Sequence, residues 1–372
     1  MKNYFIADDL SGALDAAAAF HHAGQRVRVL LSAEDWIARD DELIALTTET
    51  RNAAPETAAA AVARTLARGC IQGARLRYKK IDSTLRGPIA AELTALAREL
   101  PGTRLLFCPA NPAVGRTIRG GVLYLHGVPV SETEFGRDPV SPVRESNLQR
   151  LLGSALGDRV VIADAATEED LASAVDRMAA GSGEWVAIGS GALARPVAAL
   201  DARSSRRAPV SPVAPGPTLL LCGSAHPLNR NQAAALQRAR GVALHELSLA
   251  APEVATAAVI ASLRSPGSAS LLVAPGRHDS ALVLRTLAAA TTKILAATGA
   301  NRLFVTGGET AFAVCGALGF SALAYAAELE PGLCLACSAP PSRPLLLAIK
   351  PGGFGDADTW LRAWDALQTP PR

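Results

Sequence analysis

The sequence lacks several features that would assign it to whole classes of protein. Aromatic residues make up only 4% and charged residues 19% of the 372 residues, and the formal net charge is +3. No basic run is interleaved with aromatic residues, so the composition does not indicate binding to nucleic acid. No apolar run approaches the roughly 20 residues that a membrane span needs. The N-terminus also lacks the pattern of a signal peptide, so we expect a cytoplasmic protein that acts without a membrane.

Several motifs with known chemistry are missing too. The pattern G-x-x-x-x-G-K-[ST] does not occur, which excludes a standard P-loop. The turn Asp8-Asp9-Leu-Ser-Gly12 is not the G-x-G-x-x-G turn of a dinucleotide-binding oxidoreductase. The six histidines have no metal-ligand spacing, and none is placed as the base of a catalytic triad. The six cysteines are scattered, and even Cys334-x-x-Cys337, without a second pair, favours reduced structural thiols.

Apolar and small residues, by contrast, are abundant. Hydrophobic residues account for 49% of the chain, and 372 residues exceed one ordinary core, so we expect two domains. Val- and Leu-rich strands alternate with Ala-rich helices, which predicts two α/β domains with mainly parallel sheets flanked by helices. The Pro-rich segment 203–217 has no apolar periodicity and predicts a linker between domains 1–202 and 218–372.

Two glycine clusters in the second half each follow an apolar strand. The first is Thr306-Gly307-Gly308-Glu309-Thr310, which leads into a helix, and the second is Lys350-Pro-Gly352-Gly353-Phe-Gly355. A strand–Gly-Gly–helix turn is common connection chemistry, but the free N–H groups at a helix N-terminus also suit a phosphate. Two such loops in one half of the chain favour a nucleotide site.

Charged residues gather where strands of the first half are expected to end. Asp8 and Asp9 follow the strand 3–7, and open parallel sheets bind ligands beyond the carboxyl ends of their strands. One aspartate can cap the helix that begins at Leu10, which leaves the other for a metal ion or for accepting a proton from a hydroxyl. Arg51 follows a later strand and is either an anion contact or a solvated loop residue.

The strand end that carries Lys79 and Lys80 is the most informative stretch of the first half. Side chains alternate along a strand, so the two lysines face opposite sides, whereas Lys80 and Asp82 share a side. Ser83 and Arg86 crowd the turn that follows. This density of polar groups predicts a pocket for a polyhydroxylated anion, with Lys80 or Arg86 binding a carboxylate, although a solvated charged loop is the alternative.

Four stretches in this order resemble the signature motifs of the four-carbon acid sugar kinases. They are Ala7-Asp-Asp-Leu-Ser-Gly-Ala13, Lys79-Lys-Ile-Asp-Ser-Thr-Leu-Arg-Gly87, Thr306-Gly-Gly-Glu-Thr-Ala311 and Lys350-Pro-Gly-Gly-Phe-Gly355. The resemblance spans nearly the whole chain. It implies an N-terminal domain that binds a sugar acid, a C-terminal domain that binds ATP, and an active site in the cleft between them.

The resemblance implies an ATP-dependent kinase that phosphorylates a hydroxyl of threonate, erythronate, 3-oxo-tetronate or a similar acid. An aspartate, Asp8 or Asp9, would orient or deprotonate that hydroxyl. The acid would contact Arg51, Lys80, Asp82, Ser83 and Arg86, and ATP would contact Ser224, Gly307, Gly308, Glu309, Thr310, Gly352 and Gly353. Mg²⁺ is expected on the phosphates, with a carboxylate from Asp8, Asp9 or Glu309.

A different class of function is compatible with the same residues. A non-catalytic sensor of sugar acid and nucleotide would use the same two domains, and turnover of ATP by the purified protein separates the two hypotheses. The polar segment Ser131–Ser146 is too long to be a mere connection and suits a lid or a dimer contact, so a homodimer is one expected state.

Overall fold

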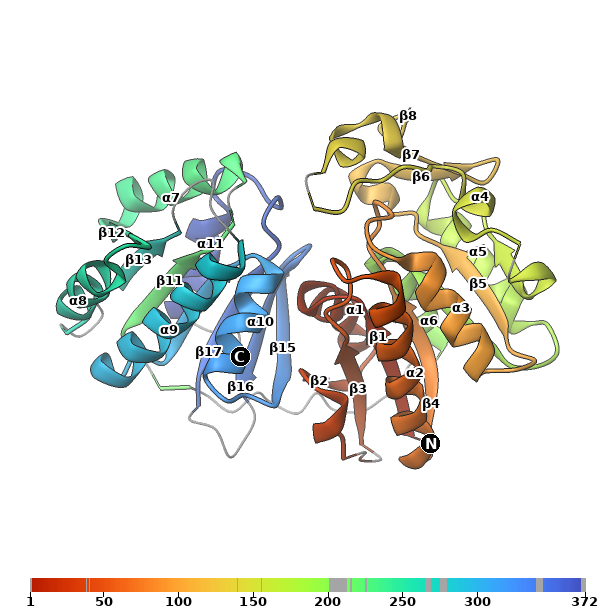
Figure 1. Cartoon of the computed structure of the whole chain (residues 1–372), viewed down its shortest axis with the longest axis horizontal. Coiled ribbons are helices and arrows are strands. Elements are labelled where there is room, and N and C mark those ends of the chain that lie inside the picture. The colour runs from red at the N-terminus through yellow and green to blue at the C-terminus, as the bar shows by residue number, and fades with distance from the viewer. Residues whose placement is uncertain are drawn as a thin grey trace. The chain divides into compact units, whose positions relative to one another are not determined.

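The chain forms two compact units, Met1–Arg207 and Ala208–Arg372 (Figure 1). The computed structural model describes residues 2–37, 39, 41–138, 140–154, 156–200, 213–214, 216–224, 226–264, 269–274, 280–338 and 344–368. The predicted linker, residues 203–217, lies largely outside the described residues. Both units have the α/β architecture that the alternating sequence pattern predicts.

The first unit is built on a parallel β-sheet. Its strands are β1 (Lys2–Ala7), β2 (Arg26–Leu30), β3 (Glu42–Thr47), β4 (Ala74–Lys80), β5 (Arg104–Cys108), β9 (Val160–Ile162) and β10 (Trp185–Gly189). They lie in the order β2-β3-β1-β4-β10-β5-β9, with parallel pairing throughout the described strands. Because helices cover both faces of the sheet, the central strands are continuous apolar runs, and such runs can be predicted from the sequence.

Helices pack on both faces of this sheet. They are α1 (Leu10–His22), α2 (Pro55–Ile71), α3 (Ile89–Glu99), α4 (Leu148–Leu152), α5 (Glu168–Ala179) and α6 (Gly191–Leu200). Neighbouring residues of β1 show the two faces, because Phe5 stacks on Phe20 of α1 whereas Tyr4 lies against Gly69 of α2. Helix α6 packs on α1 and α5, and α2 packs on α3.

A small antiparallel sheet and two short helical turns complete the first unit. The sheet consists of β6 (Arg116–Arg119), β7 (Val122–Leu125) and β8 (Val128–Pro129) in that order. Strands β7 and β8 form a hairpin, and β6 adds a third strand. The polar segment Ser131–Ser146 contains the 3₁₀ turns η3 (Val130–Glu132) and η4 (Glu134–Arg137).

The carboxyl ends of the central strands are level in the first unit. Ala7 pairs with Thr47 of β3 and with Lys80 of β4. Lys80 in turn pairs with Gly189 of β10, and Gly189 pairs with Cys108 of β5. The loops after these strands therefore begin at one edge of the sheet, the edge at which open parallel sheets bind ligands.

The second unit has a mixed sheet. Its strands are β11 (Thr218–Cys222), β12 (Ala243–Glu246), β13 (Ala269–Val273), β14 (Arg302–Thr306), β15 (Ala322–Glu330), β16 (Leu333–Ser338) and β17 (Leu346–Lys350). The order is β12-β13-β11-β14-β17-β16-β15, parallel from β12 to β17 and antiparallel from β17 to β15. Here too the carboxyl ends are level, because Thr306 pairs with both Cys222 and Lys350.

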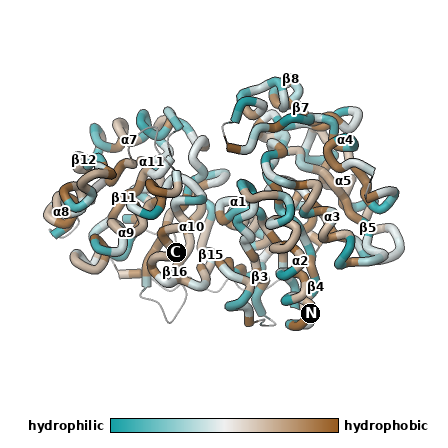
Figure 2. Tube along the Cα trace, in the orientation of Figure 1, coloured by the Kyte–Doolittle hydropathy of each residue, from teal (hydrophilic) through white to brown (hydrophobic). Residues whose placement is uncertain are grey.

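The helices of the second unit bury its apolar strands. They are α7 (Pro227–Arg240), α8 (Pro252–Ser262), α9 (Ser280–Thr298), α10 (Gly308–Ala317) and α11 (Thr359–Gln368). Helix α11 packs on α7, while α9 packs on both α8 and α10. The hydrophobic colouring of β11 in Figure 2 marks the centre of a core in which Leu220, Phe304 and Trp360 are fully buried.

Helix α9 qualifies the prediction that no apolar run is long enough to cross a membrane. Its 19 residues have a hydropathy of 1.3 and meet the length and composition of a membrane span, the one such helix among the described residues. Buried core helices of soluble proteins meet the same test. Val283, Leu287 and Ile294 of α9 are buried within the second unit, so we keep the membrane-independent, cytoplasmic state as a prediction.

Most predicted elements are confirmed, but several elements were not predicted. The helices α2, α4 and α11 were missed, and so were the strands β6, β15 and β16. The sequence of β15, Ala-Leu-Ala-Tyr-Ala-Ala-Glu-Leu-Glu, is rich in helix-favouring residues and carries no strand signature. It becomes a strand because of its ladder with β16, a case of tertiary context overriding local preference.

Candidate active site

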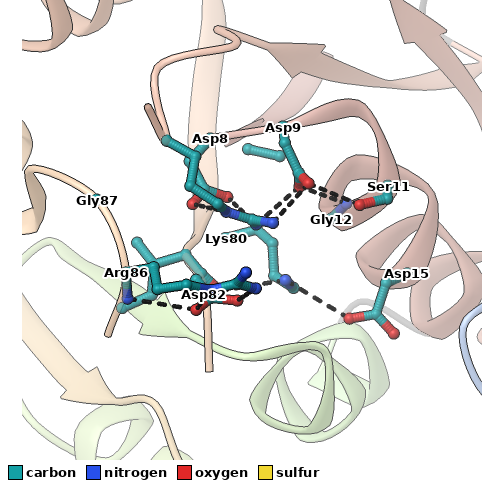
Figure 3. Close-up of polar contacts among 12 residues, drawn as sticks. Asp8, Asp9, Ser11, Gly12, Asp15, Lys80, Asp82, Arg86 and Gly87 are labelled. Carbon is teal, nitrogen blue, oxygen red and sulfur yellow. Dashed lines mark hydrogen bonds and ion pairs between the residues drawn. The ribbon is translucent and has the colours of Figure 1, made fainter. Parts of the chain in front are cut away.

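Two carboxylates and one guanidinium meet at the end of β1. Asp9 is the N-cap of α1, and its Oδ1 accepts a 2.7 Å hydrogen bond from the amide of Gly12 (Figure 3). Arg51 donates from Nη1 to Asp9 Oδ2 at 2.6 Å and from Nη2 to Asp9 Oδ1 at 2.8 Å. Its Nε and Nη2 also donate to the two carboxylate oxygens of Asp8, both at 3.0 Å. Asp9 is thus the capping aspartate, and Arg51 is bound by carboxylates and not solvated.

This pairing sets the charge states of Asp8 and Arg51. Burial by itself raises the pKa of Asp8, but the guanidinium of Arg51 overrides burial, and the pKa of Asp8 lies below its ordinary value. Burial also opposes the charge of Arg51, yet the carboxylates of Asp8 and Asp9 raise its pKa well above the usual range. Asp8 is therefore ionised at neutral pH and suits the binding of a cation.

The two lysines at the end of β4 point to opposite sides, which confirms the prediction from strand alternation. Lys79 is fully buried, and its Nζ lies 2.9 Å from Oε2 of Glu92 on α3. Lys80 points toward α1, where its Nζ lies 3.6 Å from Oδ2 of Asp15 (Figure 3). Lys79 is therefore paired within the core, whereas Lys80 lies on the side of α1 that carries Gly12 and Asp15.

Gly12 keeps a space between Lys80 and Asp9. A Cβ atom at position 12 would lie 2.5 Å from Asp9 Oδ1 and 3.1 Å from Lys80 Nζ. Because Cβ atoms do not approach other atoms to 2.5 Å, any side chain here would displace the carboxylate. The glycine of this motif is thus required by close approach and not by an unusual backbone angle.

Asp82 and Arg86 form an ion pair in the turn after β4. Arg86 donates from Nε to Asp82 Oδ2 at 2.9 Å and from Nη2 to Asp82 Oδ1 at 3.1 Å (Figure 3). Oδ2 of Asp138 lies 3.7 Å from Nη1 of Arg86. Burial by itself raises the pKa of Asp82, but Arg86, followed by Arg51, holds it well below the ordinary value. Arg86, the predicted contact for a substrate carboxylate, thus already binds a carboxylate of the protein.

Arg116, at the start of β6, was not predicted as a site residue. Its Nη1 donates to the hydroxyl of Ser83, and its guanidinium lies 5.8 Å from the centre of the Phe135 ring. Arg86 lies 5.6 Å from the same ring. Nε of Arg116 is buried without a hydrogen-bond partner within the described chain. Burial lowers the pKa of Arg116, and the charge of Asp82 offsets only part of this effect, so an anionic ligand would stabilise the arginine.

Glu49, which interacts electrostatically with Asp9, is a second residue that was not predicted as part of the site. It has a left-handed backbone with φ of +50°, and its carboxyl accepts a hydrogen bond from Thr47 Oγ1 at 2.5 Å. Burial, followed by the charge of Asp9, raises the pKa of Glu49 to about 8. A strained backbone and a perturbed carboxyl are typical of functional sites, but neither leaves a signal in the sequence Thr47-Thr-Glu49-Thr.

The predicted nucleotide contacts of the second unit converge at the carboxyl ends of β11, β14 and β17. Gly307 follows β14 with φ of +98°, and α10 begins at Gly308 without a side-chain cap. Ser224 follows β11 and faces both glycine clusters. A Cβ atom on Gly352 would lie 2.4 Å from Ser224 Oγ, and one on Gly307 would lie 3.8 Å from Ser224 Cβ.

The other three predicted contacts lie around the same point. Glu309 and Thr310 are in the first turn of α10, and Thr310 Oγ1 would be 3.3 Å from a Cβ on Gly307. A Cβ on Gly353 would lie 3.4 Å from the ring of His226, the N-cap of α7. The uncapped N-terminus of α10 directs amide groups and a partial positive charge at this point, which suits a phosphate.

Neither a metal cluster nor a disulfide marks a further site. In the part of the chain that the structure describes, no group of three or more His, Cys, Asp or Glu side chains could hold a metal ion. The six cysteines are free thiols, and Cys334 and Cys337 are buried in β16. Mg²⁺ does not require such a cluster, because it keeps several waters and is usually held by one or two carboxylates together with substrate phosphates.

Known proteins resemble the chain over nearly its full length. Residues 3–160 match the family described as a sugar-binding N-terminal domain, and residues 219–360 match the nucleotide-binding C-terminal domain. A D-threonate kinase of Bordetella bronchiseptica is 36% identical over 98% of this chain and 96% of that protein. A 3-oxo-tetronate kinase of Burkholderia multivorans is 30% identical over 97% of this chain and 96% of that protein.

A solved structure is similar as well. It is a domain of unknown function from Bordetella bronchiseptica, determined with bound citrate as a domain-swapped dimer. That chain is 33% identical to this one, with a TM-score of 0.51, and the similarity covers 99% of each chain. The predicted sugar-acid contacts lie in the part that matches the sugar-binding family, and the predicted ATP contacts lie in the nucleotide-binding part.

Proposed function

The chain belongs to the four-carbon acid sugar kinase family, and from that premise we propose that its substrate is D-threonate. As a member of this family, the chain is a phosphotransferase that uses ATP and acts on a hydroxyl of a four-carbon acid sugar. We choose D-threonate because the chain is 36% identical to a D-threonate kinase, compared with 30% identity to a 3-oxo-tetronate kinase.

The cations at the end of β4 and on β6 are the proposed site of the substrate carboxylate. Arg86 has one edge bound to Asp82, and among the described residues its Nη1 has only the longer, 3.7 Å contact with Asp138. Arg116 has a buried Nε without a partner among the described residues. A carboxylate that bridges these two arginines would satisfy both, with Lys80 and Ser83 available for the hydroxyl groups.

Asp8 and Asp9 are the proposed catalytic carboxylates, and Arg51 holds them in place. The side chain of Asp9 is 10% exposed and that of Asp8 only 3%, so Asp9 is the better placed to reach a substrate hydroxyl. Positioning a hydroxyl and accepting its proton is the task that phosphoryl transfer leaves to the protein. Asp8 is kept ionised by Arg51 and is suited to stabilise a nearby cation.

The loops of the second unit are the proposed phosphate site. The amides at the start of α10 and those of the Gly352–Gly353 loop would donate to the phosphates, and Ser224 lies between the two. Mg²⁺ bound with ATP would neutralise charge on the phosphates, and Glu309 is the carboxylate of this loop that could contact it. The chain's own part is to fix these donors before ATP binds.

We also propose a homodimer. A chain 33% identical to this one over 99% of the length was solved as a domain-swapped dimer. Light scattering of the purified protein should give about twice the monomer mass of 38.4 kDa. A monomer mass at all working concentrations would contradict the proposal.

A coupled assay of ADP release tests the proposed substrate. The panel contains both enantiomers of threonate and of erythronate together with 3-oxo-tetronate, and D-threonate should give the highest kcat/KM. A preference for 3-oxo-tetronate would replace the proposed acid but keep the reaction. Binding of ATP and acid without any ADP release would instead support the non-catalytic sensor.

A further inference from the structure

The ammonium group of Lys350 is enclosed by the backbone of the second glycine loop. Lys350 ends β17 and is fully buried. Its Nζ donates to the carbonyl oxygens of Pro351 at 2.9 Å, Gly352 at 3.1 Å and Phe354 at 2.8 Å. Within the described residues it forms no ion pair with a carboxylate, and the partners of its ammonium group are carbonyls of this loop. A buried charge without a counter-ion is costly, which indicates a specific role.

Two buried amide side chains hold the same loop from α7. Asn229 donates from Nδ2 to the carbonyl of Gly352 at 2.9 Å. Gln232 donates from Nε2 to the carbonyl of Asp356 at 2.6 Å and to that of Phe354 at 3.4 Å. Both side chains are fully buried. The carbonyl side of the loop is therefore bound from within, by Lys350 at its centre and by α7 at its flank.

The direction of these carbonyls determines the direction of the loop amides. In a trans peptide the C=O and the following N–H point to opposite sides. When Lys350 binds the carbonyls of residues 351, 352 and 354, the amides of Gly352, Gly353 and Gly355 are directed away from its ammonium group. None of these three amides has a hydrogen-bond partner among the described residues. They are donors prepared for an external acceptor.

We propose that Lys350 is a positioning residue for the nucleotide, which shapes the Gly352–Gly353 loop by binding its carbonyls and thereby presents three amides to the phosphates. The proposal rests on the proposed function and adds to it a residue that does not itself touch ATP. The lysine has a second effect, because its positive charge beneath the loop favours an anion above it. A methionine of similar length would fill the space but provide neither the donors nor the charge.

The protonation of Lys350 makes this role dependent on pH. Burial lowers the pKa of Lys350 to about 8. The titratable groups that oppose this shift when ionised are Cys222 on β11, whose own pKa burial raises, and Glu330 on β15. The neutral amine has two N–H donors for three carbonyls. Affinity for ATP should therefore fall as the pH rises through about 8.

Calorimetric titration with ATP compares the wild-type protein with Lys350→Met. At pH 7 the variant should bind ATP about 10-fold or more weakly, and D-threonate should bind both proteins equally. The wild-type dissociation constant should rise between pH 7 and about 9.5, whereas that of the variant should stay nearly constant. Lys293→Met, on an exposed position of α9, is the matched control and should behave as wild type.

The outcomes separate the role of Lys350 from the proposed function. Failure of the wild-type protein to bind ATP at pH 7 would overturn the proposed function. Equal affinity of wild type and Lys350→Met would overturn the role of Lys350 alone. The pH series on the wild-type protein tests the role of Lys350 even if the variant does not fold. A dissociation constant for ATP that is unchanged up to pH 9.5 would contradict a role for the ammonium group.

Discussion

At the scale of single residues, the carboxylates around Arg51 differ in what they can do. Asp9 accepts from the amide of Gly12, from Ser11 and from two nitrogens of Arg51, so both its oxygens are bound. Among the described residues, the side chain of Asp8 accepts hydrogen bonds from Arg51 alone. Burial, followed by the charge of Asp9, raises the pKa of Glu49 to about 8, whereas Arg51 holds the pKa of Asp8 below its ordinary value. The neighbouring ends of β1 and β3 thus contain carboxyl groups that differ in protonation state at neutral pH, an arrangement that acid–base chemistry uses.

Asp9→Asn should separate the capping role from the chemical one. The remaining oxygen can still accept from Gly12, but the new NH₂ group faces the donors of Arg51, which should lower the free energy of unfolding by about 1–3 kcal/mol. The turnover number should fall by about 10²-fold or more, since an amide does not accept the proton of a hydroxyl. Asp170→Asn, at the N-terminus of α5, is the control that should change stability only slightly and turnover not at all. A parent-like turnover number of Asp9→Asn would show that the aspartate is structural.

Glu49→Gln should change the dependence of stability on pH. Because burial, followed by Asp9, raises the pKa of Glu49 from 4.5 to about 8, the folded chain holds a proton there that the unfolded chain releases. Between these pH values the wild-type protein loses stability with rising pH, by at most about 1.4 kcal/mol per unit. The glutamine variant lacks this loss. Its melting temperature relative to wild type should therefore increase from pH 5 to pH 8, and a constant difference would argue against a protonated Glu49.

At the scale of elements, the N-terminus of α10 is the central part of the proposed phosphate site. Helix α10 begins without a side-chain cap, so its first amides are available to a ligand. The backbone turns into the helix at Gly307, which has a positive φ of +98°. The next residue, Gly308, is already helical. The turn between strand and helix therefore requires glycine at position 307.

Gly307→Ala should impair ATP binding beyond its effect on folding. The new Cβ would lie 3.3 Å from Thr310 Oγ1 at an unfavourable φ, which should destabilise the protein by about 1–2 kcal/mol and raise the KM for ATP about 10-fold. Gly319→Ala is the matched control, because Gly319 has φ of +70° with open space around it and follows the other end of α10. It should show a similar loss of stability and an unchanged KM. Equal effects of both variants on KM would contradict a phosphate site at Gly307.

At the scale of the whole molecule, each unit has a core of its own. Phe5, Phe20 and Tyr78 pack together in the first unit, and Phe304 packs against Trp360 in the second. A ligand that binds only the folded form of one unit stabilises that unit by mass action. Two units with separate cores should therefore respond separately to the two substrates.

Scanning calorimetry should resolve this response. ATP at about 100 times its dissociation constant should stabilise the second unit by about 2.7 kcal/mol and raise only the transition of that unit. D-threonate should raise only the transition of the first unit. A single transition that both ligands raise equally would show that the units unfold together.

The sequence by itself determined the features that depend on neighbouring residues. Apolar runs and alternating helices predicted most strands and helices of both units, and glycines after β14 and β17 predicted the converging loops of the second unit. Strand alternation predicted the opposite directions of Lys79 and Lys80. Each of these follows from local backbone geometry and from the period of side chains along an element.

Only the tertiary structure decided which residues that are distant in the sequence form ion pairs or hydrogen bonds with one another. Arg51 binds Asp8 across 43 positions of the sequence, and Arg116 reaches Ser83 across 33. The pKa of Glu49 and the carbonyl contacts of Lys350 depend on burial, which is the sum of everything packed around a group. Because strand order and packing bring these residues together, the electrostatics of the site cannot be obtained from any single stretch of the chain.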